Sequence, residues 1–152
     1  MKNTNLEVLR IDDFEDVKEH FYLNDDSGTF AFRDKDYTGA VEITSAGARA
    51  LGNNWKGMFA DTKVSKVIAK DTSNVTNMSD MFRGTQAESL DLSNFDTSNV
   101  TDMSYMFLDS KATSLDLRNF DTSNVTDMSY MFAYSKVTSL DLSSFDTSKV
   151  TD

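Results

Sequence analysis

Aspartates recur along the C-terminal part of the chain at a fixed interval, and their carboxylates could hold a cation. The interval is 25 residues, and each aspartate precedes Thr-Ser and then Asn or Lys. Calcium needs several oxygen ligands around one ion, usually with glycine-containing turns. Each interval supplies only one such carboxylate, so we expect these side chains to accept hydrogen bonds from nearby backbone amides instead. The aspartates are Asp71, Asp96, Asp121 and Asp146.

The remaining residue types offer little for catalysis. His20 is the only histidine and cysteine is absent, so neither a metal cluster nor a catalytic triad is suggested. The 6 glycines form no phosphate-binding loop. We therefore expect a protein that is not an enzyme and that has no cofactor and no metal site.

The aspartates belong to a longer repeated motif. Leu90 to Phe107 reads LDLSNFDTSNVTDMSYMF, and Leu115 to Phe132 is identical except that Arg118 stands in place of Ser93. A degenerate copy lies at 71–82, and another copy begins at Leu140. The 25-residue period falls within the range of leucine-rich repeats.

Each copy can be divided into a strand, a turn and a second apolar segment. Leu90 and Leu92 alternate with polar residues, which predicts a short strand with the leucines facing inward. Met103, Met106 and Phe107 are spaced as one face of a helix. Stacked copies would bury these apolar groups against each other. We expect parallel strands near residues 65–69, 89–93, 114–118 and 139–143.

The N-terminal segment does not follow the period. Residues 11–20 and 45–51 have helical patterns, and Gly28 closes a polar turn between two apolar runs, which predicts a hairpin. We assign residues 1–54 to an N-terminal α+β cap over the first coil. Residues 55–152 form the repeat domain of about four coils, the last incomplete.

The predicted fold is thus an α/β repeat solenoid of leucine-rich-repeat type. It would be a right-handed coil with one parallel sheet and short helices on the convex side. Two sets of outward residues are candidates for partner binding. One is the row along the sheet, and the other is a tyrosine between two core methionines in each copy. These residues are Asp91, Asp116, Asp141 and Arg118 in the row, and Tyr105 and Tyr130 in the second set.

Charge and hydropathy exclude several classes of partner. The net charge of −10 favours solubility and argues against direct nucleic-acid binding, which needs a basic patch. No run of about 18 apolar residues predicts membrane insertion. Residues 1–10 contain no signal-peptide pattern. The final copy reaches residue 152 before its second apolar segment, so we also expect end-to-end self-association through residues 140–152.

The repeat resembles that of BspA-like bacterial surface proteins, a branch of the leucine-rich repeats. The matching pattern is LDLSxFDTSxVTDMSxMF, carried at 90–107 and 115–132 and in part at 71–82 and 140–152. The resemblance implies a secreted or wall-attached bacterial protein that adheres to host or matrix proteins. It supplies no catalytic residues.

These observations favour a non-catalytic adhesion module that presents a repeated polar face to a protein or glycan partner at the cell surface. One alternative is a cytoplasmic acidic inhibitor, of phage or bacterial origin, that imitates nucleic acid and occupies a basic groove. Another alternative is a structural spacer. The sequence does not identify the ligand.

Overall fold

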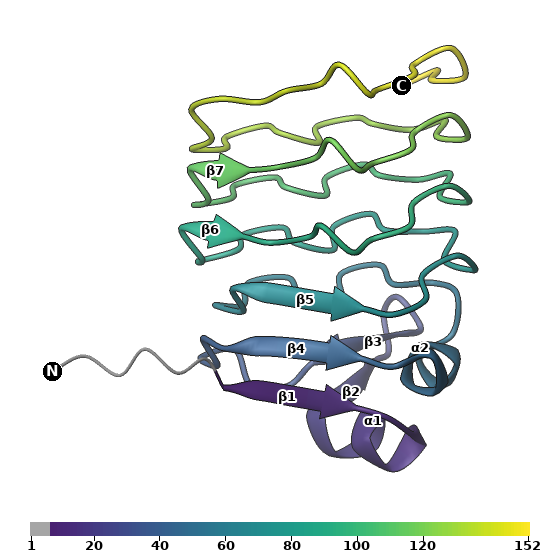
Figure 1. Ribbon diagram of the computed structural model, residues 1–152, viewed down its shortest axis with the longest axis vertical. Helices are drawn as coiled ribbons and strands as arrows, with labels where there is room; N and C mark the ends of the chain where they lie inside the picture. The colour runs from purple at the N-terminus through teal and green to yellow at the C-terminus, as the bar shows by residue number, and fades with distance from the viewer. Residues whose placement is uncertain (1–6) are drawn as a thin grey trace, which may run out of the picture.

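The computed structural model describes residues 7–152, and these form a single stack of chain segments (Figure 1). The first six residues of the expected cap lie outside the described part of the chain. The strands are short and fall into three small sheets. In chain order the elements are β1 (Val8–Ile11), α1 (Phe14–His20), β2 (Phe21–Asn24), β3 (Thr29–Phe32), β4 (Ala40–Ile43), α2 (Ser45–Leu51), β5 (Lys66–Ala69), β6 (Ser89–Leu90) and β7 (Ser114–Leu115).

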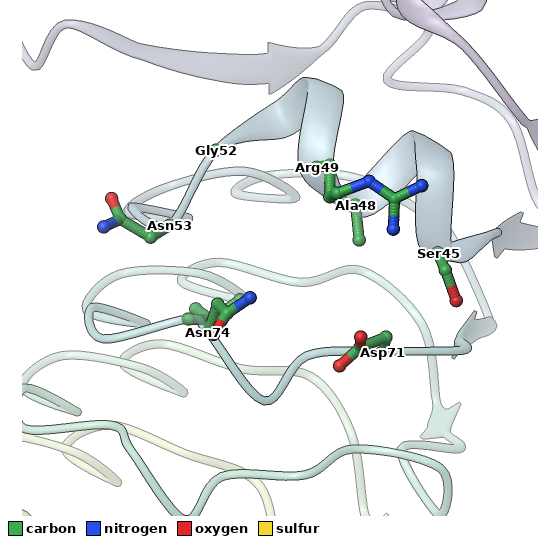
Figure 2. A pocket seen from close by; sticks show the side chains of 8 residues that line it. Ser45, Ala48, Arg49, Gly52, Asn53, Asp71 and Asn74 are labelled. Carbon is green, nitrogen blue, oxygen red and sulfur yellow. The ribbon is translucent and has the colours of Figure 1, made fainter.

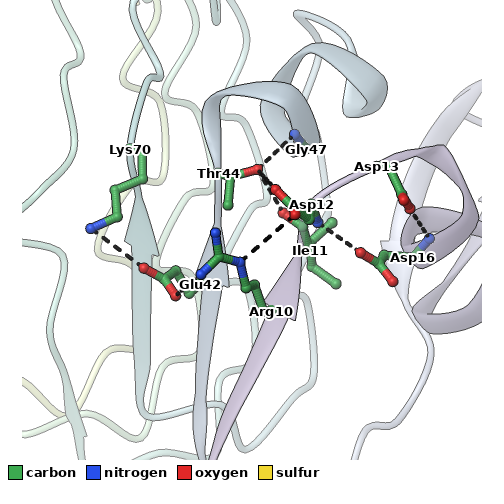
Figure 3. Close-up of polar contacts among 9 residues, drawn as sticks. All are labelled: Arg10, Ile11, Asp12, Asp13, Asp16, Glu42, Thr44, Gly47 and Lys70. Carbon is green, nitrogen blue, oxygen red and sulfur yellow. Dashed lines mark hydrogen bonds and ion pairs between the residues drawn. The ribbon is translucent and has the colours of Figure 1, made fainter.

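Side-chain caps begin both helices of the N-terminal part. The Asp13 carboxylate accepts the Asp16 N–H at 2.9 Å, and the Thr44 hydroxyl accepts the Gly47 N–H at 3.1 Å (Figure 3). Each bond satisfies an amide that the first helical turn leaves without a partner. A side chain at Gly47 would collide with the Ile11 carbonyl, so glycine there lets α2 pack against β1.

The cap and the repeats share one sheet. Strands β1, β4 and β5 pair in parallel in that order, with Val41 opposite both Leu9 and Val67. Glu42 on the middle strand lies between Arg10, at 3.9 Å, and Lys70, at 3.4 Å (Figure 3). The first strand after residue 54 therefore continues the sheet that the cap begins.

Successive copies of the motif lie one above another with a constant offset. Ser89 pairs with Ser114 and Leu90 with Leu115, both in parallel, and a bridge joins Ser114 to Ser139. The parallel direction agrees with the prediction, but the strands are shorter than expected, and residues 139–143 contribute only the bridge. The reason is a turn directly after the strand, where the Asp91 carboxylate accepts the Ser93 N–H at 3.0 Å.

The prediction of short helices on the convex side is wrong. In the described residues, 104–109 and 129–134 are consecutive turns. The Met103, Tyr105 and Phe107 amides donate to carbonyls of the next coil at 2.9 Å, so they are not available for bonds within a helix. The Met106 amide donates to Met103 three residues back, at 3.3 Å, as a tight turn requires.

The predicted core residues of this segment are nevertheless buried. Met103, Met106 and Phe107 have no exposed surface. The phenylalanines of successive coils form a stacked ladder, with ring centroids 5.7 to 5.9 Å apart and planes within 7° of parallel. Phe32 of the cap lies 5.5 Å from the first ring, so the core runs without a break from the cap into the coils. The ladder consists of Phe59, Phe82, Phe107 and Phe132.

The last copy of the motif is less covered than the others. Leu142 is 42% exposed, and Phe145 and Val150 are only partly buried. Self-association through residues 140–152 stays a prediction.

Candidate binding surfaces

The pattern Asp-x-Ser occurs three times in the copy at 90–107 and twice in the copy at 115–132, where Arg118 replaces the first serine. Each instance forms the same local turn. At Asp96, one carboxylate oxygen accepts the Ser98 N–H at 3.0 Å and the Ser98 hydroxyl at 2.6 Å. The same pair of bonds occurs at Asp91 with Ser93 and at Asp102 with Ser104. The expectation that these aspartates stabilise turns is confirmed for Asp71, Asp96, Asp121 and Asp146.

Two of the three carboxylates in the predicted charged row along the sheet form ion pairs within the molecule. Asp91 forms an ion pair with Lys66 at 3.4 Å. Asp116 receives two hydrogen bonds from the Arg118 guanidinium, at 2.9 and 2.8 Å, which lowers the pKa of its carboxyl to about 2. Hydrogen bonds from Ser143 lower the pKa of Asp141. The row thus lies together as predicted, but most of its carboxylates already have partners.

The predicted tyrosines form a different surface, on the turn segments of the coils. The rings of Tyr105 and Tyr130 contact edge to face with centroids 5.3 Å apart, and Tyr130 is 63% exposed. Tyr134, which was not predicted, is 85% exposed and follows Tyr130 by one turn. We call Tyr105, Tyr130 and Tyr134 the tyrosine row. Among the described residues, no hydrogen bond or ion pair joins it to the charged row.

The tyrosine row has an unusual backbone. Tyr105, Tyr130 and Tyr134 have φ values of 61°, 55° and 56°, in the left-handed region that side chains rarely adopt. This conformation costs roughly 1 kcal/mol for a residue of this type. Strain of this kind is concentrated at functional sites.

The left-handed positions recur in every coil, two per coil and four residues apart. Earlier coils place glycine at one of the two, at Gly57 and Gly84, and aspartate at the other, at Asp61 and Asp80. Glycine adopts this conformation without cost, and aspartate tolerates it. Gly57 and Gly84 were the sequence signal that could have revealed these left-handed turns. Tyr134 stands at the position equivalent to Gly84, so the same signal could have singled it out.

A small pocket of about 330 Å³ lies beneath α2, where the cap meets the first coil (Figure 2). Arg49 and Asp71 line it, and Asn53 and Asn74 contribute amide groups. Asp71 is already bound by Ser73, whose hydroxyl and N–H lower the pKa of the carboxyl more than Arg49 does. The Asp71 carboxylate thus already has hydrogen-bond partners within its own turn.

His20 lies beside Glu19, with Nε2 3.4 Å from a carboxylate oxygen. Within residues 7–152, no group of at least three histidine, cysteine or acidic side chains is arranged to hold a metal ion. Over the same part of the chain, no helix is both long enough and apolar enough to cross a membrane.

Comparison with known proteins gives one match. A protein-family model described as "Mycoplasma protein of unknown function, DUF285" matches residues 53–152. The matched residues include every copy of the repeated motif. No curated protein and no solved structure matches the chain.

Proposed function

The chain belongs to the DUF285 family of Mycoplasma proteins, and we propose that it is a non-catalytic adhesion module that binds a protein or glycan partner through the tyrosine row. In this proposal the module is part of a bacterial surface protein and acts outside the cell. The repeats are a right-handed solenoid of the BspA-like, leucine-rich type. The 25-residue offset between β6 and β7, and across every isolated bridge after the one from Asn54 to Asn77, supports that assignment.

The observation that carries the proposal is the backbone of the tyrosine row. Side chains of three tyrosines are retained at positions where glycine or aspartate stands in earlier coils. Tyrosine is enriched at protein interfaces because its ring supplies contact area and its hydroxyl supplies a hydrogen bond. The three tyrosines strain the backbone and add little buried surface to the fold. A binding role would explain why tyrosine stands at these positions.

The rival functions would use other residues. A nucleic-acid mimic would need aspartates placed to meet a basic groove, but Asp91 and Asp116 form ion pairs with Lys66 and Arg118. A spacer would have no need of exposed tyrosines at strained positions. These distinctions favour the adhesion module and define the controls for its test.

The experiment is a binding screen of the 152-residue chain against immobilised extracellular-matrix proteins and a glycan array. The test variant replaces Tyr105, Tyr130 and Tyr134 with asparagine, which tolerates the left-handed conformation. The control variant replaces Asp91, Asp116 and Asp141 with asparagine. We expect binding to at least one matrix protein or glycan that the tyrosine variant loses and the aspartate variant keeps. Equal binding by wild type and the tyrosine variant to every immobilised protein and glycan would contradict the proposal. No binding to any of them would also contradict it.

A further inference from the structure

A second concave surface lies where the cap hairpin meets the turn segments of the first coils. It is a cleft of about 630 Å³, within the range of ligand pockets. Tyr22 and Asn24 from β2 form one wall. Asp61, Arg83 and Asp109, from three successive coils, line the other. The cleft shares no residue with the tyrosine row, so an inference about it stands apart from the proposed function.

The charges in this cleft are balanced, although the protein as a whole is strongly acidic. Three cationic and three anionic side chains line it, against a net charge of −10 for the chain. A balanced site gives no electrostatic attraction to a polyanion or a polycation. The cations are Lys35, Lys56 and Arg83, and the anions are Asp61, Asp80 and Asp109.

The cleft also offers a mixture of hydrogen-bonding groups. Asp80 and Arg83 are paired at 3.2 Å, and their outer atoms can still donate and accept. The carboxylate of Asp109 has no side-chain partner among the described residues, and Asp109 is exposed. A ligand that both donates and accepts hydrogen bonds could satisfy all of these groups.

An aromatic ring completes the site. Tyr22 is 39% exposed, and the Lys35 ammonium lies 5.6 Å from the centre of its ring. Lys35 is held in turn by the Ala60 carbonyl at 3.3 Å. Burial lowers the pKa of Lys35, and nearby Asp61 opposes that shift. The ammonium lies over one face of the ring, and the exposed part of the ring can contact an apolar patch of a ligand.

We propose that this cleft binds a neutral oligosaccharide. Sugar hydroxyls donate to carboxylates and accept from ammonium and guanidinium groups, and the carbon–hydrogen face of a sugar can rest on the tyrosine ring. The phosphates of a nucleotide would gain no net attraction, because three carboxylates balance the three cations of the cleft. An apolar ligand would leave the many polar lining groups without partners.

The test is calorimetry with the 152-residue chain and several probes. Cello-, N-acetylchito- and manno-oligosaccharides are the neutral sugars, and a heparin oligosaccharide is the anionic one. Polylysine serves as a cationic probe. The cleft variants are Tyr22→Ala and Asp109→Gly, since glycine preserves the φ of 56° at position 109. The matched control is Leu23→Ala, the next residue on β2, which is 55% exposed and does not line the cleft.

We expect a neutral oligosaccharide to bind and each cleft variant to weaken its Kd about tenfold or more. Leu23→Ala and the tyrosine-row variant should bind as wild type does. The inference is overturned if no neutral probe binds at about 10 mM, or if only heparin or polylysine binds. It is also overturned if the cleft variants bind normally. Loss of sugar binding in the tyrosine-row variant alone would overturn this inference and leave the proposed function standing.

Discussion

Thr97 and Asp121 lie in neighbouring coils and exchange two hydrogen bonds. The Thr97 hydroxyl donates to the Asp121 carbonyl at 3.0 Å and accepts the Asp121 N–H at 2.8 Å. Thr97 itself is 1% exposed, although Asp121 lies at the surface. The same exchange joins Thr72 to Asp96 and Thr122 to Asp146. One buried hydroxyl per coil therefore connects each copy of the motif to the next.

Thr97→Val should lower the free energy of unfolding by about 1 kcal/mol, because it removes both hydrogen bonds to the Asp121 backbone. Urea denaturation measures the loss. The control is Thr101→Val, because Thr101 is exposed and its hydroxyl donates one bond, to the Thr76 carbonyl at 3.3 Å. Equal losses of unfolding free energy in the two variants would show that the paired Thr97 hydrogen bonds contribute no more to stability than the single Thr101 bond.

Phe107→Ala should destabilise the protein by about 3–5 kcal/mol, because it removes a ring from the middle of the stacked ladder and leaves a cavity. The ring lies between Phe82, at 5.9 Å, and Phe132, at 5.7 Å. Tyr105→Ala, only two residues away, should cost less than about 1 kcal/mol, because Tyr105 is only partly buried. Similar losses in urea titrations would contradict this assignment of inward and outward residues.

Stability should fall in acid because several turn aspartates have pKa values below those of an unfolded chain. Hydrogen bonds lower the pKa of Asp116 to about 2 and also lower those of Asp71, Asp121 and Asp146. A carboxyl with a lowered folded pKa contributes stability above its unfolded pKa, near 4. That contribution is lost as the pH falls from about 4 toward 2. Urea midpoints that stay constant from pH 5 to pH 2 would be inconsistent with these turns.

Arg118→Ser provides the control for that prediction, because Ser93 and Ser143 occupy the equivalent positions. The guanidinium is the largest cause of the low pKa of Asp116. The variant should raise this pKa, as measured by NMR titration of the carboxyl carbon, and leave the pKa of Asp71 unchanged. An unchanged Asp116 pKa would show that the ion pair does not form in solution.

Calcium should not affect folding. The carboxylates at Asp96 and its equivalents already accept hydrogen bonds from their own turns, and each coil supplies one of them. Added calcium or a chelator should therefore leave the Tm unchanged. A rise in Tm with calcium concentration would make the aspartates a metal site and reverse this assignment.

The buried residues could be predicted from the sequence, but the backbone that carries them could not. Leu90, Met103 and Phe107 are buried as predicted, because a residue that recurs at each period must face its own copies. The helix predicted around Met103 is absent from the described chain, because bonds between coils compete with bonds within a helix. The spacing of Met103, Met106 and Phe107 is compatible both with one face of a helix and with the two consecutive turns that the structure has.

The candidate binding residues were predicted only in part. Tyr105 and Tyr130 were identified because they interrupt a methionine pattern, whereas Tyr134 lies in the less regular connection between copies. The partners of the charged row depend on the rotamers of Arg118 and Lys66, which spacing does not determine. The cleft beside Tyr22 joins residues 22 and 109, and no repeat relates the hairpin to the coils.

The binding role of the tyrosine row is tested most directly by the stability of the variant in which Tyr105, Tyr130 and Tyr134 are all asparagine. Asparagine relieves the left-handed strain, so urea denaturation should give a free energy of unfolding equal to or above that of wild type, while adhesion is lost. A loss of more than about 2 kcal/mol would show that the tyrosines stabilise the fold, and it would contradict their assignment as residues retained for binding.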